Sequence, residues 1–278
     1  MSIGVTHRKI EDILDLQSVY DMLSLKGKTA LVTGGSGGIG RSTSAAMAEL
    51  GAKVMLMDLP SRESQLQKAV ADIKQRYMAE CDYVLGDVRD VESIEAFVEK
   101  TAERFGTIDI LHNNAGIGIA GDNADITKDA WDNIVAINLT GPMFVAQAVA
   151  DKMKSNPAGG SIVTTASMSG IIVNTGPGYA ATKAGVLHMT NALAIALAVD
   201  NIRCNSVCYG YILSGMHENP SSDPVRLEHT YSRFEETTPM KRCGTLSEVV
   251  GCVVYLASDL GRFTTGSAIV VDGGFSIQ

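Results

Sequence analysis

Long apolar runs are absent from this sequence. No stretch reaches the roughly 18 consecutive apolar residues that a membrane-spanning helix needs, and the first residues carry no short apolar core typical of a secretion signal. We therefore expect a soluble, cytoplasmic protein without a membrane partner.

Paired cysteines are also missing. The five cysteines are odd in number and include no C-x-x-C arrangement: Cys81, Cys204, Cys208, Cys243 and Cys252. A disulfide framework or a structural zinc site normally shows regular pairs of cysteines. The pattern predicts reduced cysteines and no metal site.

Basic residues are fewer than acidic ones. The chain has 23 Lys and Arg against 31 Asp and Glu, which gives a net charge of −8. Because phosphate backbones are bound by clustered cations, this balance argues against nucleic acid and anionic membranes as partners.

The 278 residues, 45% of them apolar, suffice for a full hydrophobic core. Strand and helix patterns alternate from residue 28 to the C-terminus without a Pro/Ser-rich linker, which predicts one domain at 28–278 after an N-terminal extension at 1–27. Near-helical spacing of apolar residues between Ile10 and Leu23 suits a short amphipathic helix on the body or on a neighbouring subunit. A tail without fixed structure is the alternative.

Seven short apolar runs predict strands, and the segments between them have helical patterns. The strands are expected at 28–33, 52–57, 82–85, 108–112, 160–166, 202–207 and 268–271, the helices at 39–50, 64–78, 91–105, 131–153, 178–198 and 247–258, and a polar irregular segment at 209–245. This alternation predicts an α/β fold: a Rossmann-like, doubly wound parallel sheet with helices on both faces. Ligands of such sheets bind beyond the carboxyl ends of the strands.

A glycine-rich turn, Thr33-Gly34-x-x-x-Gly38-Ile39-Gly40, follows the first strand. Glycines permit a sharp turn and let the backbone approach a diphosphate at a helix N-terminus, although such a turn alone can be merely structural. Asp58 lies 18 residues after Gly40, close to the spacing of a carboxylate that binds a ribose 2′-hydroxyl. That carboxylate would repel the 2′-phosphate of NADP. The turn has Gly37 at the position where an Arg could have bound that phosphate, and the nearby Arg62 is expected to lie at the surface. The sequence predicts NAD.

Tyr179-Ala-Ala-Thr-Lys183 places a phenol and an ammonium four residues apart, on one face of a helix. A neighbouring ammonium favours the phenolate and lowers the pKa of the tyrosine from about 10. We expect Tyr179 to exchange protons near neutral pH.

With these motifs, Asp87-Val88, Asn113-Asn114-Ala115-Gly116, Asn138 and Ser167 complete a set that resembles the classical short-chain dehydrogenases/reductases over residues 25–274. The sugar and polyol dehydrogenases of this family are the most similar in character. The resemblance implies hydride transfer between NAD(H) and a secondary alcohol or ketone.

The resemblance also implies the catalytic roles. Tyr179 is the general acid/base, Lys183 binds the nicotinamide ribose and lowers the tyrosine pKa, and Ser167 binds the substrate oxygen. Asn138 holds a water that relays protons through Lys183. Ser169 is the alternative catalytic hydroxyl.

The implied cofactor site is larger. Asp87 and Val88 hold the adenine, and Asn113, Ala115 and Gly116 line the cofactor near the fourth strand. The full set of expected cofactor residues adds Gly34, Ser36, Gly37, Gly38, Ile39, Gly40, Asp58, Asn114, Tyr179, Lys183, Gly210, Ile212 and Ser214.

One position departs from the family pattern. Tyr209 replaces a proline expected after the sixth strand, which predicts a freer loop and a ring available to the nicotinamide or substrate. Cys208 is expected to be a packing residue. Of the histidines, His112 and His188 are expected to be structural, whereas His217 and His229 are candidate substrate contacts.

The polar segment 211–245 is expected to form a lid over the site. Its composition favours a polar, hydroxylated substrate such as a polyol or sugar. Hydroxysteroids or other secondary alcohols, 3-oxoacyl groups and a non-catalytic NAD sensor remain alternatives. The family resemblance further implies a dimer or tetramer assembled through the helices at 131–153 and 178–198.

Overall fold

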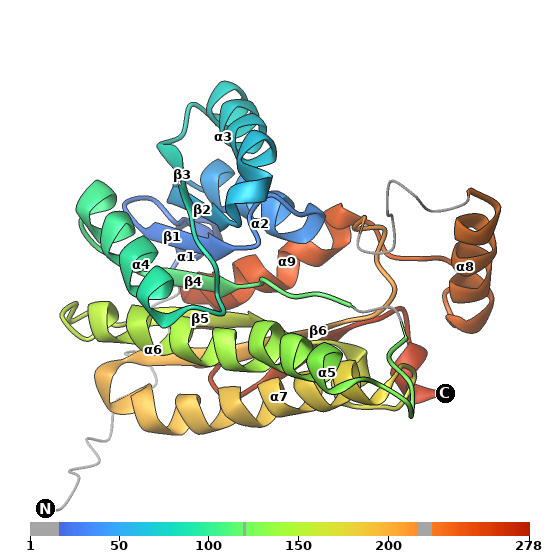
Figure 1. Cartoon of the computed structure of the whole chain (residues 1–278). Helices are drawn as coiled ribbons and strands as arrows, with labels where there is room; N and C mark the ends of the chain where they lie inside the picture. Colours follow the sequence, from blue (N-terminus) through green and yellow to red (C-terminus); the bar gives the residue numbers. More distant parts are fainter. Residues whose placement is uncertain (1–16, 119–120, 216–223) are drawn as a thin grey trace, which may run out of the picture.

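Seven parallel strands form one sheet in the order β3-β2-β1-β4-β5-β6-β7, which confirms the predicted doubly wound α/β fold. The computed structural model describes residues 17–118, 121–215 and 224–278 (Figure 1). The strands are β1 (Thr29–Thr33), β2 (Lys53–Asp58), β3 (Cys81–Leu85), β4 (Ile110–Asn113), β5 (Gly160–Thr165), β6 (Ile202–Tyr209) and β7 (Ala268–Val271). Each predicted strand is present.

The central strands are buried on both faces. All residues of β1 are buried, as are the four middle residues of β2 and of β5. A strand covered on both sides is apolar at most positions, which explains why these strands read as nearly continuous apolar runs.

Helices cover both faces of the sheet (Figure 1). On one face lie α2 (Gly38–Glu49), α3 (Glu63–Tyr77) and α9 (Leu246–Ala257), and on the other α4 (Val91–Phe105), α6 (Gly141–Met153) and α7 (Pro177–Leu197). Each layer has its own core. Met47 and Leu66 belong to the core of the first, and Phe97 and Val145 to that of the second.

The long helix predicted at 131–153 is interrupted. It begins earlier, as α5 (Lys128–Val135), passes through a π-helical turn at Ala136–Thr140, and continues as α6. Such single π turns are inserted bulges that occur frequently at functional sites. The buried Asn138 lies in the middle of this one.

The expectation of an irregular segment at 209–245 was wrong in part, because α8 (Pro224–Thr237) forms within it. Figure 1 shows α8 standing away from the sheet. At the other end of the chain, α1 (Val19–Leu23) is the described part of the predicted N-terminal helix, and residues 1–16 lie outside the described chain.

Two helical stretches, 128–153 and 177–200, are long and apolar enough to cross a membrane by length and composition alone. Their inward residues pack on the sheet: Val145, Val149 and Ala194 all belong to the core beneath β5 and β6. Packing on the sheet therefore accounts for the apolar character of the buried residues of these stretches.

Candidate active site

A cleft of about 1000 Å³ opens at the carboxyl ends of the strands. It lies where the strand order reverses between β1 and β4, the position at which doubly wound sheets bind ligands. Its walls include nearly every residue predicted for catalysis or cofactor binding; Gly40, Asn113 and Asn138 do not line it.

The glycine-rich turn forms the floor of the cleft. Gly34 has φ +66°, and a Cβ on Gly40 would stand 2.3 Å from the carbonyl oxygen of Gly34. Gly40, predicted to bind the cofactor, thus allows α2 to pack closely on the turn. Gly37, the N-cap of α2, supplies no side-chain cap. The first N–H groups of the helix are thus available to a diphosphate, so the residues fit a dinucleotide.

Asp58, the last residue of β2, is held in a fixed orientation at the cleft wall. Its Oδ2 accepts hydrogen bonds from Ser36 Oγ at 2.6 Å and Ser36 N at 3.1 Å, and its Oδ1 accepts one from Leu59 N at 2.9 Å. Ser36 therefore supports the carboxylate predicted to select the cofactor. Arg62, expected at the surface, is exposed and also lines this cleft.

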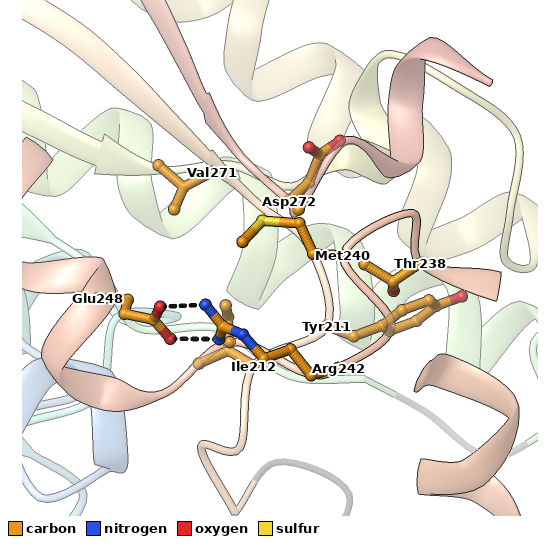
Figure 2. Close-up of a pocket in the computed structure, with 10 residues that line it drawn as sticks. Tyr211, Ile212, Thr238, Met240, Arg242, Glu248, Val271 and Asp272 are labelled. Atoms are coloured by element: carbon orange, nitrogen blue, oxygen red, sulfur yellow. Dashed lines mark hydrogen bonds and ion pairs between the residues drawn. The ribbon is translucent and has the colours of Figure 1, made fainter. Parts of the chain in front are cut away.

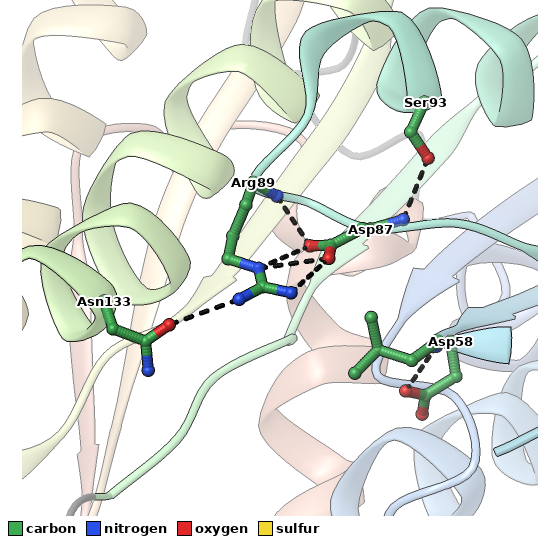
Figure 3. A network of polar contacts seen from close by, with 6 residues as sticks. Asp58, Asp87, Arg89, Ser93 and Asn133 are labelled. Carbon is green, nitrogen blue, oxygen red and sulfur yellow. Dashed lines mark hydrogen bonds and ion pairs between the residues drawn. The ribbon is translucent and has the colours of Figure 1, made fainter. Parts of the chain in front are cut away.

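A second carboxylate, Asp87, is engaged by an arginine that the sequence analysis missed (Figure 3). Arg89 donates from Nε to both carboxylate oxygens at 3.0 Å and from Nη2 to Oδ2 at 2.6 Å, and its Nη1 reaches Asn133 Oδ1 on α5 at 3.3 Å. These bonds hold the pKa of Asp87 below its usual value. The signal available in the sequence was an arginine two residues after the aspartate.

Two successive asparagines at the end of β4 have different surroundings. The side chain of Asn113, predicted to line the cofactor, is buried, and its Nδ2 donates to the carbonyl oxygen of Pro142 at 2.7 Å. Asn114 lines the cleft, donating to Thr33 O at 3.1 Å and accepting from Thr165 Oγ1 at 3.1 Å. Strand alternation accounts for the difference, because successive side chains point to opposite faces.

Three of the four predicted catalytic residues, Ser167, Tyr179 and Lys183, line the cleft, and the buried Asn138 lies behind its wall. Tyr179 and Lys183 occupy the first two turns of α7, and Ser167 follows β5. Lys183 Nζ donates to Thr165 O at 2.9 Å. A Cβ built on Gly116 would lie 3.4 Å from Asn138 Oδ1 and 3.6 Å from Lys183 Nζ, so both groups face one small volume.

Ser167 and Tyr179 line the same cleft. Ser167 Oγ donates to Ser169 Oγ at 3.1 Å. Ser169 N in turn donates to Ser167 Oγ at 3.1 Å. Ser169 thus orients Ser167, which agrees with the predicted role of Ser167 and gives Ser169 a supporting one.

The expected lowering of the tyrosine pKa was wrong for this structure. Burial raises the pKa of Tyr179, and the hydrogen bond with Ser167 opposes this only in part. The ammonium of Lys183 lies 5.6 Å from the centroid of the Tyr179 ring and is directed to the Thr165 carbonyl. Burial also lowers the pKa of Lys183 to about 8. Tyr179 therefore carries its proton at neutral pH.

Tyr209, whose ring was expected to be available to the nicotinamide or substrate, lines the cleft, but most of its side chain lies in the core. Its side chain is only 4% exposed, packs with Val207 and Val249 in the core under α9, and directs its hydroxyl to the carbonyl oxygen of Val249 at 3.4 Å. Cys208 is buried with Ala166 and is a packing residue as predicted. A proline at this position would restrain the loop after β6 through its fixed φ, whereas Tyr209 restrains the loop by packing its ring into the core.

The histidines take no part in the described site. His112 is fully buried between Thr43 Oγ1 at 2.9 Å and Thr165 Oγ1 at 3.2 Å, so its structural role is confirmed. His188 is exposed on α7. His229 is exposed on α8 and does not line the cleft, and His217 lies outside the described residues.

A smaller cavity of about 110 Å³ adjoins the cleft and shares Tyr211 and Ile212 with it (Figure 2). Arg242 and Glu248 both line this cavity, and Arg242 Nη1 and Nη2 donate to the Glu248 carboxylate at 2.8 and 2.6 Å. Gly244 N donates to Tyr211 O at 2.8 Å. These contacts hold the segment that carries Ile212, predicted to meet the nicotinamide, against α9.

Comparison with known proteins agrees with this geometry. The family model described as enoyl-(acyl carrier protein) reductase matches residues 34–276. An L-rhamnose 1-dehydrogenase (NAD(P)(+)) of Sphingomonas is 37% identical over 92% of this chain and 99% of its own length. The chain belongs to the short-chain dehydrogenase/reductase family. It is an oxidoreductase that uses a nicotinamide cofactor.

Further relatives extend the match. A sorbose reductase of Candida albicans is 36% identical over 93% of this chain and 90% of its own length. The crystal structure of a short-chain type dehydrogenase/reductase from Mycobacterium marinum superposes with a TM-score of 0.87 at 35% identity, covering 94% of this chain and all of that one. Members of the family with sugar substrates are thus among its similar proteins.

Proposed function

We propose that this enzyme is an NAD-dependent dehydrogenase of a sugar or polyol, acting on a secondary alcohol or the corresponding ketone. The observation that carries the proposal is the convergence of Ser167, Tyr179 and Lys183 at a cleft whose wall also presents Asp122 and Asn174. A bound nicotinamide supplies the hydride acceptor or donor. Ser167 holds the substrate oxygen, and Tyr179 gives or takes its proton.

NAD is the proposed cofactor because Asp58 presents a carboxylate where a 2′-phosphate would have to lie. The Ser36 bonds keep that carboxylate in place. Two observations favour a test of NADP as well. Arg62 and Arg89 line the same cleft and could bind a phosphate, and the name of the Sphingomonas relative includes both NAD and NADP. NAD and NADP are therefore compared in every assay.

The test is the change in absorbance at 340 nm with purified enzyme and a panel of substrates. The panel contains L-rhamnose, other aldoses, polyols, L-sorbose with NADH, hydroxysteroids and a 3-oxoacyl thioester. Turnover of sugars or polyols with NAD is the expected result. Turnover of hydroxysteroids or 3-oxoacyl groups alone would overturn the proposed substrate class, and higher kcat/KM with NADPH would overturn the cofactor.

We also propose a cytoplasmic homo-oligomer, a dimer or tetramer. Outward residues of the α7 region are apolar and exposed: Ile195 is 80% and Val199 84% accessible, and Phe144 on α6 is 39% accessible. Apolar residues gathered on neighbouring helices suit a second copy of the chain. Light scattering that gives the monomer mass, 29.4 kDa, would refute this.

A further inference from the structure

The first turn of α7, which carries Tyr179, has no cap of its own. Its N-cap residue Gly176 has no side chain, and Pro177 has no N–H. The N–H groups of Gly178 and Tyr179 are two of the four that every helix leaves without an intrahelical partner. Ala180 N is the first to bond within the helix, to Gly176 O at 3.1 Å.

Asp122 supplies the missing cap from a distant loop. Its Oδ1 accepts a hydrogen bond from Gly178 N at 2.8 Å, and its Oδ2 accepts one from Tyr179 N at 2.8 Å. One carboxylate therefore satisfies both N–H groups, and its negative charge lies at the positive end of the helix dipole. The two partners are 56 and 57 residues away in sequence.

The helix start is shaped to receive this loop. A Cβ on Gly176 would stand 1.7 Å from the carbonyl oxygen of Asp122, and one on Gly178 would stand 3.1 Å from Asp122 Oδ1. Glycine is thus needed at Gly176 for the two segments to meet. The contact is a packed junction between the loop after β4 and the catalytic helix.

We infer that Asp122 is a positioning residue for catalysis: it holds the backbone of Tyr179, and so fixes the phenol relative to Ser167 and the substrate oxygen. The inference rests on the proposed proton-transfer role of Tyr179. Asp122 also lines the cleft, so direct contact with substrate is the competing role. The two roles differ in kinetics, because loss of positioning lowers kcat whereas loss of a uniform substrate contact raises KM.

Four variants test the inference. Asp122→Ala removes both bonds, and Asp122→Asn keeps the shape but sets an amide N–H against one of the two backbone N–H groups. Gly176→Ala disrupts the junction while leaving the carboxylate in place. Asp125→Asn, an exposed aspartate of the same loop, is the matched control.

Because a displacement of about 1 Å can cost roughly 100-fold in rate, we expect kcat to fall about 10- to 100-fold in Asp122→Ala and Gly176→Ala, and less in Asp122→Asn. KM for substrate and the affinity for NADH, measured by fluorescence, should stay within about twofold. Amide exchange of Gly178 and Tyr179 should become faster in the same order. The control should match the wild type in all three.

Unchanged kcat in Asp122→Ala, unchanged exchange at Gly178 and Tyr179, or a rise in KM at constant kcat would overturn the inference. A fall in activity that merely follows the folded fraction in thermal unfolding would also overturn it. The kinetic comparison uses any alcohol or ketone that the wild type turns over. Failure of the sugar proposal therefore changes the substrate but not the comparison, and the exchange measurement needs no substrate.

Discussion

The side-chain amide of Asn138 bonds both backbone groups of Ile117: its Oδ1 accepts from Ile117 N, and its Nδ2 donates to Ile117 O, each at 2.8 Å. Asn138 is fully buried in the π turn between α5 and α6, and Ile117 follows Gly116, which is predicted to line the cofactor. The π turn therefore fastens the start of the loop after β4, and Asp122 fastens a later point of it to α7.

Removing this clamp should destabilise the fold as well as the site. In Asn138→Ala, both backbone groups of Ile117 lose their partners, at a cost of about 1–3 kcal/mol for each group that stays buried and unpaired. Asn138→Asp keeps the acceptor but buries a carboxylate whose second oxygen faces Ile117 O, so it should be at least as destabilising. Urea unfolding monitored by circular dichroism measures both. Equal stability of Asn138→Ala and wild type would contradict the clamp.

Replacing the phenol should abolish proton transfer without disturbing the cofactor. We expect Tyr179→Phe to lower kcat by about 100- to 10,000-fold, the usual contribution of a general acid/base, with unchanged NADH binding. Because burial raises the pKa of Tyr179, the deprotonated form needed for alcohol oxidation grows as pH rises. Wild-type oxidation should therefore accelerate towards alkaline pH, whereas ketone reduction should not. A rate of oxidation that is highest in acid would contradict this assignment.

Arg89 should matter to cofactor affinity through Asp87. Arg89→Ala frees a carboxylate that the guanidinium now holds at three contacts, and a partly exposed pair of this kind is worth up to about 1 kcal/mol. We expect KM for NAD to rise up to about fivefold, with little rescue by Arg89→Lys because an ammonium cannot form the paired contact. Arg104→Ala, which breaks the exposed pair with Asp82, is the control. An equal effect of both variants on KM would point to surface charge instead.

Asp58 should govern the choice between NAD and NADP. Asp58→Ala removes the carboxylate that Ser36 orients, and with it both the predicted ribose bond and the repulsion of a 2′-phosphate. We expect kcat/KM to fall with NAD and to rise with NADP, and the ratio of the two serves as the internal control. A ratio that does not move would show that discrimination lies elsewhere in the cleft.

The strands and the active-site motifs could be predicted because their signals are local. A strand buried on both faces is mostly apolar, and the glycine turn, Ser167 and Tyr179-x-x-x-Lys183 have fixed spacing. The rest depends on contacts between distant segments. Asp122 caps a helix more than fifty residues away, and the pKa of Tyr179 is set mainly by burial, which no spacing reports. The polar composition of α8 did not predict a helix. Its Phe234 stacks on the distant Tyr211, with ring centroids 3.7 Å apart, a contact that the local sequence does not reveal.

His112 should make the fold sensitive to acid. Its ring is fully buried, and burial lowers the pKa of His112 from 6.5 to about 3. Between these two values the unfolded chain binds a proton at this histidine that the folded chain does not. The stabilising contribution is therefore complete above about pH 6.5 and is lost as pH falls towards 3, with a slope that approaches about 1.4 kcal/mol per pH unit.

Carboxylates also titrate in part of this range, so the histidine has to be isolated by difference. His112→Gln cannot take up the proton, and although it should unfold more easily at pH 7, its free energy of unfolding should fall less steeply between pH 6.5 and 4.5. His188→Gln, at an exposed position of α7, should keep the wild-type slope. Urea unfolding at several pH values gives the three slopes. The prediction is contradicted if the free energy of unfolding of His112→Gln depends on pH as steeply as that of the wild type. The buried ring would then titrate in the folded protein as it does in the unfolded chain, and the acid sensitivity would have another origin.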